Sequence, residues 1–230
     1  MRREKNAVVA AMLGAALALT ASTASLAQSK GLYMGASMGR SKVDIDTADL
    51  EAQFEAARAA AAGAGAEFTG SVSADEKDRG WKLFLGYKFG RYFALEGGYV
   101  DLGAFESSSI ANTTSGGTTT TAESRVTLKA KQGGHVSALL MFPMTDQFSL
   151  FGRLGAYSVR TTVESSASAG PTGSESKRGA GVLFGFGAGY EINESASLRL
   201  EWERYSKIKA PGDAEKFNVD VIAFGLLFGF

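Results

Sequence analysis

The chain has 230 residues, 24 basic and 24 acidic side chains, and no cysteine. The balanced charge gives no indication of a nucleic-acid partner, and the absence of cysteine excludes disulfides and thiol catalysis. Glycine is abundant at 29 residues, and past the N-terminus no apolar run approaches the roughly 18 residues of a membrane-spanning helix.

The first 27 residues have the organisation of an export signal. A basic start over residues 2–5 precedes an apolar segment over residues 7–19, and Ser25-Leu26-Ala27 supplies the small residues of a cleavage site. We therefore predict a signal peptide over residues 1–27 and one mature domain over residues 28–230. An uncleaved anchor is the alternative.

A first strand is predicted from Gly31 to about Arg40, because larger apolar residues alternate there with small ones. A long connection follows, from Ser41 to Asp78. Within it Leu50, Phe54 and Ala57 share one helical face. We expect a short amphipathic helix in this loop, with a partly disordered alanine-rich loop as the alternative.

Residues 80–102 form the clearest predicted hairpin, since large apolar side chains alternate along both halves around the turn Gly90-Arg91-Tyr92. The next segment, Gly103 to Ser124, is rich in serine, threonine and glycine and shows no periodicity. It is predicted to be a mobile, exposed loop.

Further strands are predicted over residues 126–142, 148–162, 179–192, 196–207 and 217–230. Short turns (143–147 and 193–195) alternate with polar connections (165–177 and 207–216). Eight strands joined in this way predict an all-β fold, an eight-stranded antiparallel up-and-down transmembrane β-barrel with long external loops. Pairing of the last strand with the first would leave no free edge in lipid.

The final strand carries the sharpest membrane signal. One face is large and apolar and includes Phe228 and Phe230, whereas the opposite face is mostly small. A soluble sheet would place polar residues on one of these faces. The strand resembles the closing strand of outer-membrane barrels, and this resemblance implies that Phe230 and Phe228 form the terminal signal that the barrel assembly machinery reads. An ordinary edge or core strand is the alternative.

Three segments resemble the OmpA-like transmembrane domain family: residues 80–103, residues 138–155 with Pro143-Met144-Thr145-Asp146, and residues 187–202 with Arg199-Leu200-Glu201-Trp202. The resemblance covers residues 31–230 apart from the external loops. It implies a bacterial outer-membrane location, no cofactor, and a monomer surrounded by outer-membrane lipid and lipopolysaccharide. It also implies contact with surface ligands or phage through the loops. The peptidoglycan-binding domain of larger members is not expected.

Strand alternation places six charged side chains inside the barrel: Lys82, Glu96, Arg153, Arg199, Glu201 and Glu203. Buried charges are costly unless they are paired, so we predict an interior ion-pair network.

The resembling family is proposed to gate its barrels with two glutamates, an arginine and a lysine. Glu96 and Arg199 stand at two of these positions, and Gly189 and Leu139 occupy the other two. We therefore expect a static plug centred on a Glu96–Arg199 pair, without the alternative partners of a switch. Loss of Arg199 should then strand Glu96.

A catalytic interpretation rests on His135, the only histidine, and Ser137, whose His-x-Ser spacing resembles the lipid A deacylase family. Residues two apart on a strand share a face, but alternation puts both inside the barrel, away from lipid. No matching acid is evident. We expect no catalytic residue, no metal site and no enzymatic activity.

Three functions are therefore considered. The first is a structural protein that supports envelope integrity and presents surface loops. The second is a narrow ion or small-solute pore, and the third is a lipid A-modifying enzyme. A wide porin is excluded, because the interior of an eight-stranded barrel holds little more than its own side chains.

Overall fold

A computed structural model describes residues 31–43, 48–168, 172–209, 211 and 216–230, so the predicted signal peptide lies outside the described residues. Within these ranges, no helix has the length and apolar content needed to cross a membrane. The described elements are β1 (Gly31–Val43), α2 (Ala48–Gly63), β2 (Glu67–Asp75), β3 (Lys77–Lys88), β4 (Phe93–Asp101), β5 (Gly103–Ser115), β6 (Thr118–Pro143), β7 (Phe148–Ala167), β8 (Gly173–Glu191), β9 (Ala196–Ile208) and β10 (Phe217–Gly229).

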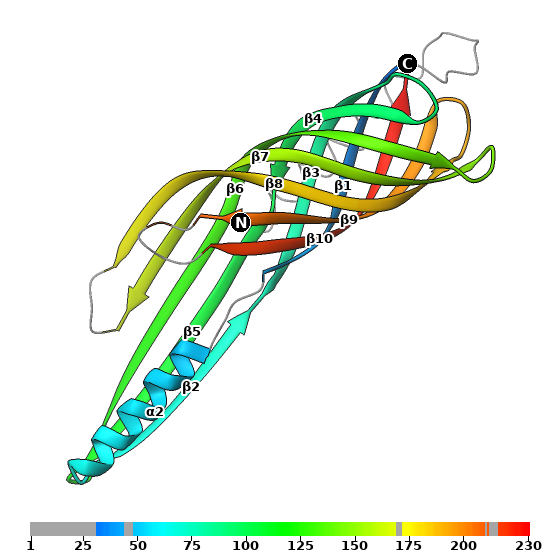
Figure 1. Ribbon diagram of the computed structural model, residues 1–230. Helices are drawn as coiled ribbons and strands as arrows, with labels where there is room; N and C mark the ends of the chain where they lie inside the picture. The colour runs from blue at the N-terminus through cyan, green and yellow to red at the C-terminus, as the bar shows by residue number, and fades with distance from the viewer. Residues whose placement is uncertain (1–30, 44–47, 169–171, 210, 212–215) are drawn as a thin grey trace, which may run out of the picture.

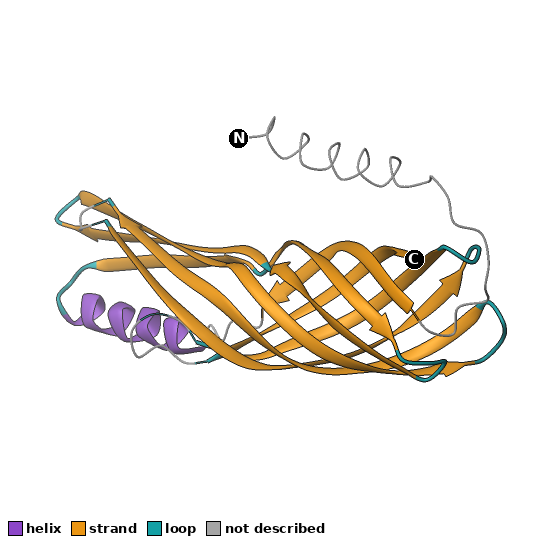
Figure 2. Ribbon diagram, turned by 90° about the horizontal axis from the view of Figure 1, so that it is seen from above, coloured by secondary structure: helices purple, strands orange, loops and turns teal. Residues whose placement is uncertain are grey.

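Eight of these strands close into the predicted barrel. The ring runs β1-β3-β4-β6-β7-β8-β9-β10 and back to β1, with every neighbouring pair antiparallel. Tyr33 on β1 faces Gly229 on β10 and Gly86 on β3. The last strand therefore pairs with the first, as predicted, and the strands wrap obliquely around the barrel (Figures 1 and 2).

The outer face of the ring is an apolar band. Its exposed side chains include Leu32, Met34, Met38, Leu83, Leu85, Leu95, Val136, Leu140, Leu154, Val182, Phe186, Leu200, Ile222 and Phe224. Exposed apolar side chains at this density, alternating with buried positions along each strand, are what a lipid-facing barrel surface requires.

On the inner face of the ring, small residues lie opposite large ones, so that the side chains fit the narrow interior. A Cβ atom at Gly86 would overlap the ring of Tyr33, and one at Gly35 would overlap the ring of Phe84. Glycine at these positions is therefore needed for close approach inside a narrow ring. This close approach is one physical reason for the high glycine content of the chain.

The predicted loop from Gly103 to Ser124 is wrong, because it is a β-hairpin. β5 pairs with the first half of β6 from Gly103↔Ala130 to Ser115↔Thr118. Gly116 and Gly117 have φ values of 57° and 80°, which suits a two-residue type I′ turn. The Ser/Thr-rich composition concealed strands whose threonines favour β structure.

The connection from Ser41 to Asp78 contains the predicted helix, α2, but also an unpredicted strand, β2, which pairs with β5. α2 packs on β2 through Phe54, whose ring lies 5.9 Å from that of Phe68 and over Gly70. Figure 2 shows α2 beside the strands that project from one end of the barrel.

The predicted polar loop over residues 165–177 is also partly strand. β7 continues to Ala167 and β8 begins at Gly173, and their hydroxyl groups meet at Thr162 and Ser176, 2.8 Å apart. We call these projecting parts the outer extension: α2, β2, β5, residues 118–130 of β6, 160–167 of β7 and 173–178 of β8. Because the short turns lie at the opposite end, the outer extension is on the cell-surface side.

Two matched substitutions can test whether the apolar band faces lipid. Leu200 is 56% exposed on β9 in the band, and Ile110 is 42% exposed on β5 in the outer extension. Leu200→Lys should lower the free energy of unfolding by about 2 to 4 kcal/mol, because a charge would enter lipid. Ile110→Lys should change it little. Denaturant titration in lipid vesicles measures both, and equal effects would contradict the assignment.

Candidate functional site

The six predicted interior charges all lie inside the ring and are buried. They come from β3 (Lys82), β4 (Glu96), β7 (Arg153) and β9 (Arg199, Glu201, Glu203). The three residues of β9 lie opposite Gly189, Gly187 and Gly185 of β8. Glycine on the inner face of β8 therefore leaves room for the long charged side chains of its neighbour.

Arg153 is the hub of this network. Its Nη2 atom lies 2.5 Å from Glu96 Oε2 and 3.3 Å from Glu201 Oε2, and its Nη1 atom lies 3.1 Å from Glu203 Oε1. One guanidinium thus contacts all three buried carboxylates. Arginine suits this position, since its planar fork offers five donors and keeps its charge.

Lys82 and Arg199 complete the charge balance. Lys82 Nζ lies 2.8 Å from Glu201 Oε1 and 2.5 Å from Glu203 Oε1, and Arg199 Nη1 lies 2.6 Å from Glu96 Oε1. The Arg199 guanidinium also lies 5.2 Å from the ring centre of Phe84 and 4.9 Å from that of Phe151. Three cations and three carboxylates therefore neutralise one another.

Four neutral side chains add hydrogen bonds to the charged network. The hydroxyl of Tyr33 donates to Glu96 at 2.7 Å, that of Tyr205 to Glu203 at 3.0 Å and that of Ser37 to Glu201 at 3.1 Å. Ser137 accepts from Arg153 at 3.3 Å. All four lie on inward-facing positions of their strands, as the charged residues do, so strand alternation could have identified them.

The expected Glu96–Arg199 pair is present, but it is not the centre of the network. Glu96 also binds Arg153, so loss of Arg199 would not leave it unpaired. The expectation that alternative partners are absent does not hold either. Lys82 and Glu201, which form an ion pair of 2.8 Å, supply a base and an acid in place of those that Leu139 and Gly189 lack.

Apolar layers close the barrel on both sides of the charges. Toward the short turns lie Tyr33, Phe84, Ala94, Leu139, Phe151 and Leu227. Toward the outer extension lies a larger cluster that includes Val100, Phe105, Tyr157, Val159, Leu183, Tyr205 and Ile208. On β7 the order Phe151, Arg153, Tyr157 shows the charged layer between the two apolar ones. Both layers separate the charges from water, which strengthens their mutual attraction.

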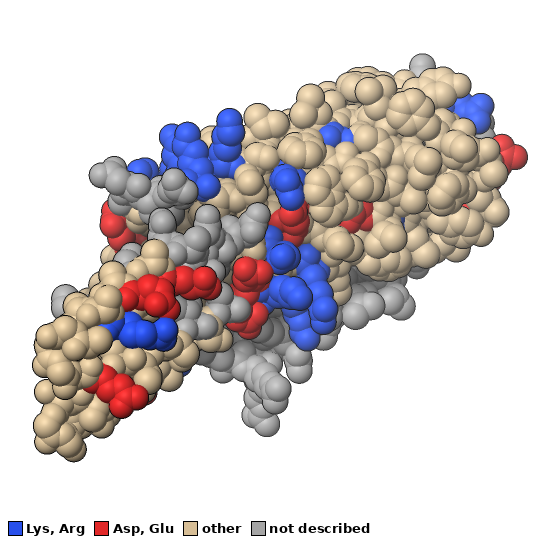
Figure 3. All heavy atoms as spheres, turned by 60° about the horizontal axis from the view of Figure 1, so that its bottom comes forward, with Lys and Arg blue, Asp and Glu red and all other residues tan. Residues whose placement is uncertain are grey.

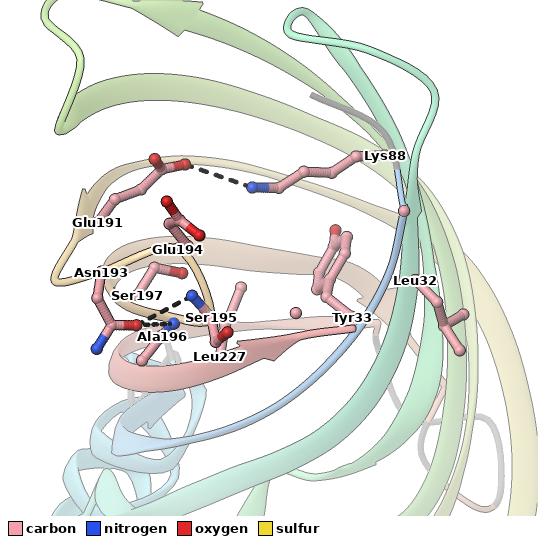
Figure 4. Close-up of a pocket in the computed structure, with 12 residues that line it drawn as sticks. Leu32, Tyr33, Lys88, Glu191, Asn193, Glu194, Ser195, Ala196, Ser197 and Leu227 are labelled. Carbon is pink, nitrogen blue, oxygen red and sulfur yellow. Dashed lines mark hydrogen bonds and ion pairs between the residues drawn. The ribbon is translucent and has the colours of Figure 1, made fainter. Parts of the chain in front are cut away.

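A pocket of about 50 Å³ opens at the short-turn end, between β1, the β8–β9 turn and β10 (Figure 4). Lys88 and Glu191 face one another across it with 3.5 Å between Nζ and Oε1. Tyr33 and Leu227 line the pocket and belong to the apolar layer beneath it. The pocket therefore ends at that layer.

His135 and Ser137 lie inside the barrel, as their alternation predicted. Neither ring nitrogen of His135 has a hydrogen-bond partner among the described residues, and the Ser137 hydroxyl is engaged by Arg153 instead. In the described part of the chain, no group of three His, Cys, Asp or Glu side chains is placed to hold a metal.

The closed ring, the apolar band and the packed interior define a small outer-membrane β-barrel. The chain matches the OmpA-like transmembrane domain family over residues 27–230 and belongs to it. It lies in the bacterial outer membrane.

Comparison with solved structures finds barrels of low sequence identity. Ail of Yersinia pestis, in complex with the heparin analogue sucrose octasulfate, is 15% identical with a TM-score of 0.43, over 87% of this chain and 99% of Ail. OprG of Pseudomonas aeruginosa is 14% identical with a TM-score of 0.43, over 90% and 99% of the two chains. No curated protein matches.

The network makes a graded stability prediction. Arg153→Met should lower the free energy of unfolding by about 3 to 5 kcal/mol, because three buried carboxylates lose a shared partner. Arg199→Met should cost less, since Glu96 retains Arg153 and Tyr33. Denaturant titration of both variants in vesicles measures the difference, and an equal or larger loss for Arg199→Met would show that Arg153 is not the hub.

Proposed function

We propose that this protein is a structural element of the outer membrane, closed to ions and solutes, that supports envelope integrity and presents the outer extension at the cell surface. The observation that carries the proposal is the interior, where a neutral network of six charges lies between two apolar layers.

The buried network favours a plug over an open channel. Glu96, Glu201 and Glu203 are each less than 3% exposed and each has at least two partners. Conduction would require these pairs and both apolar layers to separate, and each desolvated charge left unpaired costs several kcal/mol.

A gated narrow pore is the second candidate, and one observation favours it. Arg153 has three carboxylate partners and Lys82 has two, so the pairs could exchange without leaving a charge alone. Exchange by itself opens no path, however, because the apolar layers stay in place. We therefore rank the closed barrel first.

An enzymatic role is not proposed. A serine nucleophile needs a base within hydrogen-bond reach, whereas Ser137 is bonded to Arg153 and His135 has no partner among the described residues. Both lie on the inner face, away from lipid substrates.

The outer extension supports a surface role. Polar side chains on exposed positions of its hairpin make hydrogen bonds across the strands. The hydroxyls of Thr114 and Thr119 lie 2.9 Å apart, and the Thr121 hydroxyl donates to the side-chain oxygen of Asn112 at 2.8 Å. We propose that this surface meets external ligands or phage. We also propose a monomer that the barrel assembly machinery inserts by reading Phe228 and Phe230, of which Phe230 is 48% exposed at the end of the lipid-facing row.

In a strain that lacks the protein, detergents and hydrophobic dyes should cross the outer membrane more readily. Detergent sensitivity and dye uptake measure this effect. The wild-type chain should restore the barrier, and so should a chain in which residues 107–121 are shortened to a tight turn, because the barrel remains. A chain without Phe230 should fail to restore it. An intact barrier in the deletion strain would contradict the envelope-integrity proposal.

A further inference from the structure

A row of four basic side chains crosses β6, β7 and β8 and reaches the end of β9, where the barrel meets the outer extension. Lys131 on β6 faces Arg160 on β7, and Arg160 faces Arg178 on β8. Lys209, just beyond β9, packs against Gly179, where an added Cβ would lie 3.4 Å from the Cβ of Lys209. We call Lys131, Arg160, Arg178 and Lys209 the basic row.

The positive charges of the basic row are not balanced by acidic residues within the row. Directly opposed residues on neighbouring strands are about 5 Å apart, and like charges in such positions repel. None of the four makes a salt bridge with any acidic residue that the structure describes; the nearby Lys129–Glu164 and Arg204–Asp220 pairs are already matched internally. Such a row is stabilised when an anion with several charges lies across it.

The backbone is irregular near both lysines of this row. Gln132, with φ of 55°, lies in a bulge between Lys131 and Gly134. Lys207, with φ of 60°, lies near the end of β9, where two residues of β9 oppose one residue of β10. The bulge in β6 reverses the alternation of that strand, so that Lys131 joins the outer face, and Lys209 is exposed just beyond the end of β9. Positive φ is unfavourable for both residue types, and such strain is typically retained at functional positions.

The row sits just beyond the apolar band. On the outer face of β8, Arg178 is four residues from Val182, about 13 Å along the strand at about 3.3 Å per residue. In Figure 3, Lys and Arg gather beside Asp and Glu where the barrel passes into the outer extension, while the barrel side of this face carries few charges. This is the level of lipid headgroups on the cell-surface side.

Another side of the barrel carries a similar group of basic residues. Arg40 on β1 faces Arg79 on β3, and Lys42 faces Lys77, each pair directly after the apolar band. Only Lys42 has a salt bridge among the described residues of this group, to Glu76 at 3.6 Å. A headgroup partner explains why unmatched cations recur around the rim.

We propose that the basic row binds the phosphates of a multiply phosphorylated lipid in the outer leaflet. The adjacent arginines Arg160 and Arg178 would clamp a phosphate by bidentate hydrogen bonds, and Lys131 and Lys209 would extend the contact to a second phosphate. The acyl chains would lie along the apolar band beneath. This lipid site is separate from the sealed interior and does not depend on it.

The test compares two double substitutions that remove equal charge. The row variant is Arg160→Gln with Arg178→Gln. The control is Arg58→Gln with Arg125→Gln, two exposed arginines in the outer extension that pair with Glu55 and Glu106. Each full-length protein is refolded in detergent free of lipid A, and the midpoint of heat-induced unfolding is read from gel mobility as diphosphoryl lipid A is added.

We expect lipid A to raise the midpoint of the wild type and the control alike. The row variant should need about 30-fold more lipid A for the same rise, since each basic group contributes about fivefold. Without lipid A the row variant should be at least as stable as the wild type, because repulsion is relieved, so the shift cannot be a folding defect. Monophosphoryl lipid A should bind the wild type more weakly.

Three results would overturn the proposal. The row variant could match the control in its lipid A dependence. It could be less stable than the wild type in lipid-free detergent, which would make the row part of the fold. Inorganic pyrophosphate could protect the wild type at the same concentration as lipid A, which would make the row a site for soluble anions.

Discussion

The barrel depends on one buried guanidinium, that of Arg153, which contacts Glu96, Glu201 and Glu203 at the same time. Three carboxylates gathered inside a narrow ring would repel one another and would be costly to desolvate. Arg153 links the glutamate on β4 to the two on β9, and Lys82 and Arg199 supply the remaining charge. The glycines of β8 and the apolar layers on either side are arranged around this network, the first giving it room and the second keeping water away.

A single constraint of strand geometry separates the inner from the outer surface. Side chains alternate across a strand, so each apolar residue in the band is followed by one that must fit the interior. At the cell-surface rim this alternation is interrupted at Gln132 and near Lys207, and Lys131 lies on the outer face. The molecule thus has paired charges within the barrel and unmatched charges at the level of lipid headgroups.

Much of this arrangement could be predicted from the sequence. Alternation located the hairpin over residues 80–102, the closing strand and all six interior charges, because facing depends only on local geometry. Which charges meet could not be predicted, since contacts across the ring depend on strand tilt and stagger; Arg153 was therefore not recognised as the hub. The hairpin around Gly116-Gly117 was missed for a different reason. Its Ser/Thr-rich strands are stabilised by pairing with one another, and their composition resembles that of a loop.

The most direct measurement of the central claim is the ion conductance of the purified full-length protein in a planar lipid bilayer. If the network and its two apolar layers close the interior, the wild type should show little conductance and no regular gating. Arg153→Ala should conduct more, because it releases three carboxylates and opens space at the hub, whereas the control Arg125→Ala, in the outer extension, should behave as the wild type. Large, regularly gated currents from the wild type would contradict the closed barrel and support a gated pore.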